Sequence, residues 1–348
     1  MDKEKFDLKK ELQVLGDFTT TTSDPTDAQP YVYGQSLVKL MKEDENIVCL
    51  CADVQWPTEN DYIKKHFPDR YYQMGIAEAN MMGVASGMAK TGDVVFTHTF
   101  CAFTNRRSLD QIAMQVAYPK AKVIIVGFLP GISTILGVSH QAIEDVACFR
   151  SLPNMNIFEP YNETQVLPLL QMAKDSTNPS YIRMRRFNKM YDKIDSSIEI
   201  GKPQVVQKGS KLVIFASGMT VDIAIDASKR IQKEYKFLPS VINVFSLKPI
   251  NQENFINIIK EHSSVISIEN HNVIGGLGTL LSEIIAENGL NIKIDKLGVQ
   301  DTFAQGAETE FLFKKFGISS DAIVQLYENI IRKIKENFIT YFLILIDN

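Results

Sequence analysis

Residues 74–89 read MGIAEANMMGVASGMA, an apolar run that contains glycines and one carboxylate, Glu78, near its start. The spacing of the apolar residues over Glu78–Lys90 predicts a helix. An acid in the first turn of a helix is favourable, because it faces the positive end of the helix dipole. That structural role alone would explain Glu78, so the run by itself predicts a helix and no chemistry.

Short β-rich runs lie on both sides of this helix and alternate with further helical patterns. Strands are expected at Ile47–Asp53, Val94–Phe100 and Lys122–Phe128. Besides the helix at Glu78–Lys90, helices are expected at Gly34–Lys42 and Ser108–Tyr118. Strands that alternate with helices favour a mostly parallel sheet with helices on both faces.

A second α/β set follows a polar, weakly periodic crossing at Arg186–Lys208. Its strands are expected at Lys211–Ala216, Ser240–Val244, Val265–Ile268 and Lys293–Leu297. Its helices are expected at Thr220–Tyr235, Leu277–Asn288 and Ser319–Lys335. The sequence therefore predicts an α/β fold with two domains, each a mostly parallel sheet flanked by helices.

These patterns divide the chain into five segments. They are an N-terminal arm rich in Thr, Ser, Asp and Pro (1–29), a first domain (30–188), a linker (189–199), a second domain (200–336) and an apolar tail (337–348). The tail is shorter than the roughly 20 residues that span a bilayer. No signal peptide and no membrane partner are expected.

Composition narrows the class of protein. The chain has 348 residues and a net charge of −4, which argues against nucleic acid as a partner, because phosphate binding needs a basic surplus. The five histidines are scattered, so no metal site is expected. The cysteines lack CxxC spacing, which predicts core thiols in the cytoplasm. These cysteines are Cys49, Cys51, Cys101 and Cys148.

Two further stretches stand out. Residues 97–112, THTFCAFTNRRSLDQI, place two phenylalanines before paired arginines. Residues 137–155, GVSHQAIEDVACFRSLPNM, place His140 after a glycine and before a helix that carries Glu144 and Asp145. Taken singly, aromatic residues at such spacing are typical of a core, and a lone histidine is typical of a helix entry.

Taken together with residues 74–89, the order and spacing of these stretches resemble the pyrimidine-binding domain of transketolases and deoxyxylulose-phosphate synthases. Residues 268–289 and 298–319 are similar to the C-terminal domain of the same family. The resemblance covers about 30–336. It implies an enzyme, a thiamine diphosphate-dependent transferase that moves a two-carbon ketol unit from a ketose to an aldehyde.

The resemblance assigns cofactor contacts residue by residue. Glu78 would be catalytic and would share a proton with the aminopyrimidine ring of thiamine diphosphate. Phe100 and Phe103 match the aromatic wall against which that ring packs. Arg106 falls at an arginine of the synthases, with Arg107 as the alternative, and Asp53 corresponds to an acid near the cofactor.

The resemblance also assigns substrate contacts. His140 matches a histidine that contacts the hydroxyls of the bound sugar, and it is expected to be catalytic together with Glu78. Arg183, or Arg185 nearby, matches an arginine that grips substrate phosphate at the end of a strand.

The substrate loop departs from the family. Residues 131–140 read GISTILGVSH, with Ile135 and Leu136 where a Gly-Glu-Asp-Gly run is usual, and Leu129 replaces an expected phosphate-contacting histidine. Because the sugar hydroxyls would lose partners on burial, ordinary pentose phosphates should be disfavoured. A non-standard sugar is expected.

One motif of the family is missing. The diphosphate and its Mg²⁺ are usually held by a Gly-Asp-Gly motif followed by an asparagine, and the nearest cluster here, GGLG at 275–278, lacks the acid. The resemblance therefore implies a partner, an N-terminal transketolase-like subunit that carries the diphosphate-binding domain, in an α2β2 assembly.

Two alternatives remain open. A β-type subunit of a 2-oxoacid dehydrogenase, or a carboligase, shares the glutamate and the domain order but usually lacks the HQAIED and SLPNM segments. A non-catalytic paralogue is the other alternative, which the joint presence of Glu78, Phe100, Phe103 and His140 disfavours.

Overall fold

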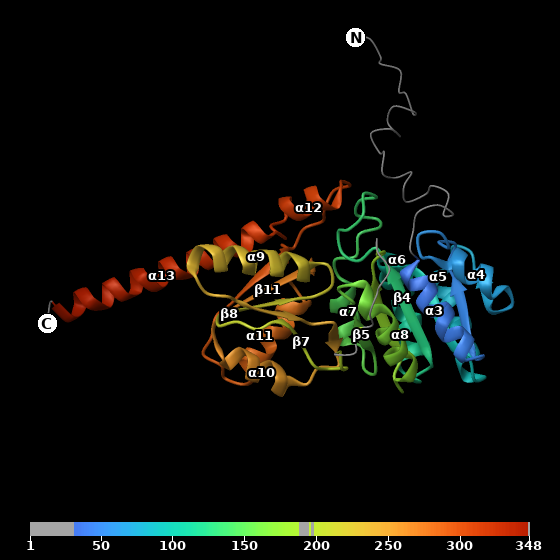
Figure 1. Cartoon of the computed structure of the whole chain (residues 1–348). Coiled ribbons are helices and arrows are strands. Elements are labelled where there is room, and N and C mark those ends of the chain that lie inside the picture. The colour runs from blue at the N-terminus through green and yellow to red at the C-terminus, as the bar shows by residue number, and fades with distance from the viewer. Residues whose placement is uncertain (1–30, 188–194, 196–197, 347–348) are drawn as a thin grey trace, which may run out of the picture.

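A computed structural model describes residues 31–187, 195 and 198–346. The expected N-terminal arm (1–29) and most of the expected linker (189–199) lie outside the described residues. Figure 1 shows two α/β bodies side by side, the first half of the chain in one and the second half in the other. Helix α13 leads away from the second body toward the C-terminus (Figure 1).

The first half of the chain supplies six strands and the helices between them. The strands are β1 (Ile47–Cys51), β2 (Tyr71–Gln73), β3 (Val94–Phe100), β4 (Val123–Phe128), β5 (Asn156–Phe158) and β6 (Ser180–Met184). The helices are α3 (Val32–Glu43), α4 (Asn60–His66), α5 (Glu78–Lys90), α6 (Cys101–Gln111), α7 (Asp145–Ser151) and α8 (Val166–Asp175), with shorter turns η1 (Pro68–Arg70), η2 (Ile112–Ala117) and η3 (Glu163–Gln165).

The second half has the same alternating character. Its strands are β7 (Gln204–Gln207), β8 (Lys211–Ala216), β9 (Ser240–Asn243), β10 (Ser246–Lys248), β11 (His262–Asn272) and β12 (Ile294–Val299). Its helices are α9 (Thr220–Tyr235), α10 (Gln252–Lys260), α11 (Leu277–Glu287), α12 (Thr309–Lys315) and α13 (Ser320–Ile346).

The first sheet has the strand order β10-β5-β6-β4-β3-β1-β2. All its pairs are parallel except β10 with β5, so a strand from the second half closes one edge of the first sheet. Strand β1 is buried on both faces: Ile47 and Cys49 pack in one cluster with α3 and α8, and Val48 and Leu50 pack in another with α5. Helices thus cover both faces, as in other parallel sheets.

The second sheet has the order β12-β11-β8-β9-β7, and only β7 with β9 is antiparallel. Helices α9, α12 and α13 pack on one face. Helices α10 and α11 pack on the other face, in a core cluster that continues into the first domain through Val146 and Phe149 of α7. The two domains therefore share this one of the hydrophobic core clusters.

The predicted fold class is confirmed, and four elements have the predicted bounds. These are α5, β3, β8 and α9. The helix predicted at Ser108–Tyr118 differs, because α6 begins earlier, at Cys101, and Ser108 has non-helical dihedrals before the wide turn η2. The short strands β2, β5, β6, β7 and β10 and the helices α4, α8, α10 and α12 were not predicted.

The C-terminal region also differs from the prediction. The helix expected to end near Lys335 continues to Ile346, through most of the expected tail, and residues 347–348 lie outside the described residues. Within the described part of the chain, no helix combines the length and the apolar character needed to cross a membrane.

Candidate functional site

The candidate residues gather where the parallel strands of the first sheet end. Strand β3 pairs with β4 so that Phe100 faces Phe128, and β4 pairs with β6 so that Phe128 faces Met184. The segments that follow these strands therefore leave the sheet at one edge. In open α/β sheets, ligands bind outside the carboxyl ends of the strands.

Glu78 is placed at this edge by the turn between β2 and α5. Gly75 adopts a φ of 70°, a left-handed conformation that glycine allows, and α5 starts three residues later. The Glu78 side chain is 3% exposed, and Arg107 Nη1 donates to its Oε1 at 2.6 Å. The site thus holds a buried carboxylate with one cationic partner.

An aromatic wall lies beside this ion pair. The Arg107 guanidinium lies 3.7 Å from the centroid of the Phe103 ring, and the Phe100 and Phe103 rings are 5.5 Å apart. The His140 ring meets Phe103 edge-on at 4.9 Å and lies 5.8 Å from Phe100. Glu78, Phe100, Phe103 and His140, predicted from three separate stretches, therefore come together.

The charge state of His140 follows from its neighbours. Burial, and then the positive charge of Arg107, lower the pKa of His140 below its ordinary value. Its Nδ1 lies 2.9 Å from Ser139 Oγ. A neutral imidazole can both donate and accept a hydrogen bond, which suits contact with a hydroxyl group.

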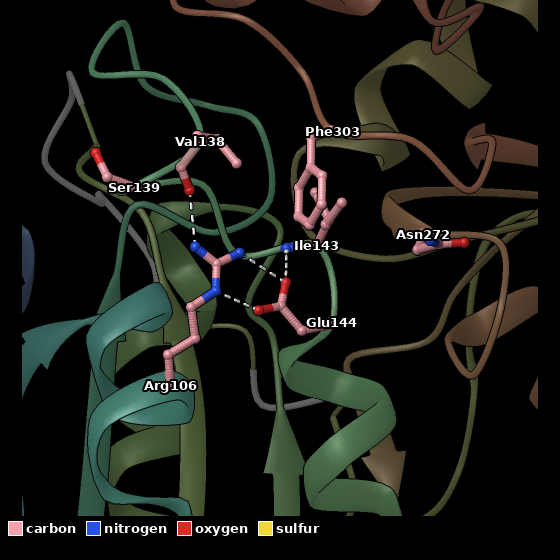
Figure 2. Close-up of a pocket in the computed structure, with 7 residues that line it drawn as sticks. All are labelled: Arg106, Val138, Ser139, Ile143, Glu144, Asn272 and Phe303. Carbon is pink, nitrogen blue, oxygen red and sulfur yellow. Dashed lines mark hydrogen bonds and ion pairs between the residues drawn. The ribbon is translucent and has the colours of Figure 1, made fainter.

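Arg106, predicted to contact the cofactor, lies outside this cluster and bonds to the loop of His140 and to Glu144. Its Nε and Nη2 donate to Glu144 at 2.5 and 3.0 Å, and it also donates to the carbonyls of Val138 (2.7 Å) and Gln141 (2.9 Å). Figure 2 shows the bonds to Glu144 and Val138 converging on one guanidinium. Neighbouring residues on a helix point about 100° apart, so Arg107 faces Glu78 while Arg106 holds the loop of His140.

The second domain holds the same loop from the other side. Asn270 Oδ1 accepts from the Ile132 amide at 2.9 Å, and its Nδ2 donates to the Pro130 carbonyl at 2.8 Å. Gln141 Nε2 donates to the Gln305 carbonyl at 3.0 Å. The position of His140 therefore depends on both domains.

A cavity of about 470 Å³ separates part of this loop from the second domain. Its lining residues are Arg106, Val138, Ser139, Ile143, Glu144, Asn272 and Phe303. Figure 2 shows Phe303 reaching over Ile143 toward the Arg106–Glu144 pair. None of Glu78, Phe100, Phe103 and Arg107 lines this cavity, so it lies outside the cluster described above.

Arg183, with Arg185 as the alternative, was predicted to grip substrate phosphate, and the structure buries Arg183 among acids. The side chain is 1% exposed and donates to Asp145 Oδ2 at 2.8 Å and to Glu159 Oε2 at 2.9 Å. Its remaining amino group donates to the Asn270 carbonyl at 3.0 Å. With its donors used inside the protein, Arg183 has a structural role.

The other two predicted residues lie at the same edge, Asp53 exposed and Arg185 half-buried. The Asp53 amide donates to Gln73 Oε1 at 2.8 Å, which joins the end of β1 to the segment that leads to Glu78. Arg185 Nη2 donates to the Tyr161 carbonyl at 2.6 Å and lies 3.7 Å from Asp222. Neither side chain contacts the Glu78 cluster in the interactions of the described residues.

The structure adds a buried acid that the sequence analysis missed. Glu59, in the loop after β1, is 2% exposed, and its Oε2 accepts from the Gly34 amide at 2.9 Å. An acid in a polar loop gives no local signal of burial, because the helix terminus it contacts lies 25 residues away.

The electrostatic link between Arg107 and His140 leads to a test in the isolated chain. In Arg107→Met we expect the pKa of His140 to rise toward its ordinary value, because a neighbouring positive charge disfavours the imidazolium. The C2-proton signal of His140 in an NMR titration measures this shift. Arg230→Met, in α9 of the second domain, is the control and should leave the His140 titration unchanged. A lower pKa of His140 in Arg107→Met would contradict the proposed effect of the Arg107 charge.

Comparisons with known proteins agree on both halves of the chain. Residues 30–190 match the family model of the transketolase pyrimidine binding domain, and residues 201–323 match that of the transketolase C-terminal domain. A putative transketolase C-terminal section from Methanocaldococcus jannaschii is 36% identical over 84% of this chain and 93% of that protein.

Two further relatives are informative. A 6-deoxy-6-sulfo-D-fructose transketolase subunit from a Clostridium species is 33% identical over 84% of this chain and 91% of that protein. A solved structure described as a split gene transketolase, inactive beta4 tetramer, superposes with a TM-score of 0.77. It is 35% identical, and the match covers 86% of this chain and 96% of that one.

Proposed function

This chain belongs to the transketolase family, and from that premise we propose that it supplies the pyrimidine side of a thiamine diphosphate site in a split transketolase. The observation that carries the proposal is the meeting of Glu78, Arg107, Phe103 and His140 at the carboxyl edge of the first sheet. The chain would act as one subunit of a cytoplasmic transferase that moves a two-carbon ketol unit.

The residues at this edge fit the cofactor. An aminopyrimidine ring needs a flat apolar surface and a carboxylic group shielded from water, and Phe100 with Phe103 and the buried Glu78 offer both. When bound, thiamine diphosphate supplies an electron sink for cleavage of the bond next to a ketone carbonyl.

Each side chain then has a distinct role. Glu78 would hold a proton at a carboxylate oxygen, where it could be shared with the aminopyrimidine ring. Arg107, which pairs with Glu78 at 2.6 Å, would keep that carboxylate oriented at the edge of the sheet. His140, neutral because of burial and Arg107, would hydrogen-bond to substrate hydroxyls.

A partner subunit is needed to complete the site. The chain lacks the Gly-Asp-Gly motif, so we propose that the partner holds the diphosphate and its Mg²⁺. Apolar side chains are exposed before α5, on α5 and around η2, as at a docking surface: Ile76, Val84, Met114 and Tyr118. That the split-gene relative is inactive as four β chains supports the same idea, and we propose an α2β2 complex.

The substrate is proposed to be an unusual sugar. Ile135 and Leu136 are half-buried in the loop that leads to His140, and their apolar side chains give no partner to a hydroxyl group. One relative is named for a sulfonated fructose, which supports substrates other than the ordinary pentose phosphates. The relatives reported above are named as transketolases, which favours this activity over that of a 2-oxoacid dehydrogenase.

The assembly can be tested by calorimetry. We expect the isolated chain to bind thiamine diphosphate weakly, and the two-chain complex to bind it tightly with Mg²⁺, because most of the affinity should come from the diphosphate and its metal. Isothermal titration of each, with and without Mg²⁺, measures the difference. Tight, Mg²⁺-dependent binding by the isolated chain would overturn the split-site proposal. Consumption of a ketose by the complex, in the presence of thiamine diphosphate, tests the transketolase activity itself.

A further inference from the structure

The loop that carries His140 is closed at its neck by a residue of the second domain. Residues 131–142 leave and return at one point, where the Ala142 amide donates to the Gly131 carbonyl at 2.9 Å. Asn270, in strand β11 of the second sheet, lies against this neck. We propose that Asn270 is a positioning residue for sugar binding, which fixes the neck and thereby His140 but takes no part in activation of the cofactor. This inference rests on the proposed function and deepens it, because it assigns the second domain to the substrate side of the site.

The side-chain amide of Asn270 makes two complementary hydrogen bonds across the neck. Its Oδ1 accepts from the Ile132 amide at 2.9 Å, and its Nδ2 donates to the Pro130 carbonyl at 2.8 Å. The reversed amide would set a donor against the Ile132 amide and an acceptor against the Pro130 carbonyl, so the two bonds define one orientation. Asn270 and Ile132 are fully buried. Loss of the Asn270 amide would therefore take a partner from a backbone group that is shielded from water, which is costly.

The close approach of Asn270 requires glycine at position 131. Gly131 has a φ of 61°, in the left-handed region that favours glycine. A Cβ atom on Gly131 would also overlap Asn270 Oδ1. The contact is thus built from both sides, with an asparagine in the strand and a residue without a side chain in the loop.

Strand β11 is itself anchored on the first domain around Asn270. The Asn270 carbonyl accepts from Arg183 Nη2 at 3.0 Å, and the Asn272 amide donates to the Ile143 carbonyl at 2.9 Å. Arg183 is in turn fixed by two buried carboxylates, as described above. The second domain therefore holds the chain both before and after the loop, through the Asn270 side chain and through the backbone of β11.

His140 lies two residues from the neck, so a shift of the neck should reach it. Within the loop, the Gly137 carbonyl accepts from the amides of His140 at 3.0 Å and of Gln141 at 3.1 Å. The next residue, Ala142, is the one that closes the neck. These bonds tie the His140 backbone to the neck, and the His140 ring meets Phe103 at 4.9 Å. Displacement of the neck is therefore expected to move this ring relative to the aromatic wall.

The cofactor side of the site is built from the first domain. Glu78 pairs with Arg107, and the Phe103 ring lies against the same guanidinium. Among the interactions of the described residues, none joins Glu78 or Arg107 to the second domain. A change at Asn270 should therefore affect sugar binding. It should leave proton exchange at C2 of bound thiamine diphosphate, the step that we assign to Glu78, at its wild-type rate.

The separation of these two steps tests the inference in the reconstituted complex. In Asn270→Ala we expect kcat/KM for the ketose donor to fall by about 10–100-fold, mainly through a higher KM, because a misplacement of about 1 Å has effects of that size. The C2 exchange rate should not change. The donors are D-fructose 6-phosphate and 6-deoxy-6-sulfo-D-fructose, the sugar for which one relative is named. Unchanged kcat/KM, or slower C2 exchange in a folded complex, would overturn the inference.

Asn243→Ala is the matched control. Asn243 is also a buried asparagine of the second sheet, in β9, and its Nδ2 donates to Gln204 Oε1 at 3.0 Å. Its removal should lower the melting temperature, as Asn270→Ala does, and leave both kcat/KM and C2 exchange unchanged. Equal falls of kcat/KM in the two variants would show a general effect of stability and would reject Asn270 as a positioning residue.

A variant on the loop side covers the case in which Asn270→Ala does not fold. Gly131→Ala places a methyl group where Asn270 Oδ1 lies, so we expect the same fall of kcat/KM with unchanged C2 exchange. Where both variants fold, Gly131→Ala combined with Asn270→Ala removes the overlap, and the combined loss should be smaller than the product of the two single losses. A combined loss equal to that product would contradict direct coupling between the two residues.

A measurement on the full chain alone keeps this inference separate from the proposed function. If the complex consumes neither ketose, the proposed function fails, and NMR titration still reports the surroundings of His140. Burial and the charge of Arg107 lower the pKa of His140. A displaced ring in Asn270→Ala should therefore titrate at a higher pH than in the wild type, whereas Asn243→Ala should titrate as the wild type does. An unchanged His140 titration in folded Asn270→Ala would overturn the inference.

Discussion

The change Glu78→Gln is expected to slow proton exchange at C2 of bound thiamine diphosphate by roughly 10²–10⁴-fold, the range for loss of a positioned acid–base group. Glutamine keeps the size and one oxygen of Glu78 but has no proton to transfer. The complex should still assemble and bind the cofactor, because ring packing and the diphosphate supply most of the affinity. NMR of the quenched cofactor after incubation in deuterated water measures the exchange rate.

The structure supplies a second first-turn acid, Asp321, as an exposed control for this prediction. Asp321 is a first-turn acid of α13 that pairs with Arg230 at 2.6 Å, as Glu78 is a first-turn acid of α5 that pairs with Arg107 at the same distance. If Glu78 only stabilised its helix, both Glu78→Gln and Asp321→Asn would cost about 0.3–1 kcal/mol of stability and leave exchange unaffected. Near-normal exchange in a folded Glu78→Gln complex would reject the catalytic assignment.

The second large effect is on stability. Arg183→Met is expected to lower the free energy of unfolding by about 3–5 kcal/mol, because removing one member of a buried ion pair leaves the other charges uncompensated. Here those charges are Asp145 and Glu159, both 2% exposed or less. Urea unfolding of the isolated chain, followed by circular dichroism, measures the loss.

A compensating variant covers the case in which Arg183→Met does not fold. Adding Asp145→Asn and Glu159→Gln removes the stranded charges, so the triple variant should recover much of the lost stability. Arg230→Met breaks an exposed pair and should cost no more than about 1 kcal/mol. If Arg183 instead held substrate phosphate, Arg183→Met would unfold at the wild-type urea concentration and change only KM.

The elements that could be predicted from the sequence have long, regular patterns. Helix α5 and strand β3 were predicted at their observed bounds because apolar spacing and β-rich composition agree along their full length. Strands of three residues, such as β2 and β5, carry too few positions for a period to be recognised. Strand β10 depends on pairing with β5, which lies far away in the sequence.

The residues of the candidate site also fall into those that the sequence could predict and those that it could not. Glu78, Phe103 and His140 could be placed in one site because their three stretches together resemble the pyrimidine-binding domain of transketolases, and the structure brings them together. The choice between Arg106 and Arg107 depends on the direction of each side chain from α6, which is kinked at Ser108. The burial of Arg183 depends on partners 24 and 38 residues away, and no local pattern reports them.

The pairing of β10 with β5 also limits how a gene for this protein could be divided. A gene break at the codons between the two domains would place β5 and its edge neighbour in different polypeptides. The same break would separate Lys248 from the carbonyls of Arg150 and Leu152, which accept hydrogen bonds from its ammonium group. Fission or recombination at that point would yield two products, one with an unpaired edge at β5 and the other with an unpaired β10. These domains are therefore best inherited together as a single evolutionary module.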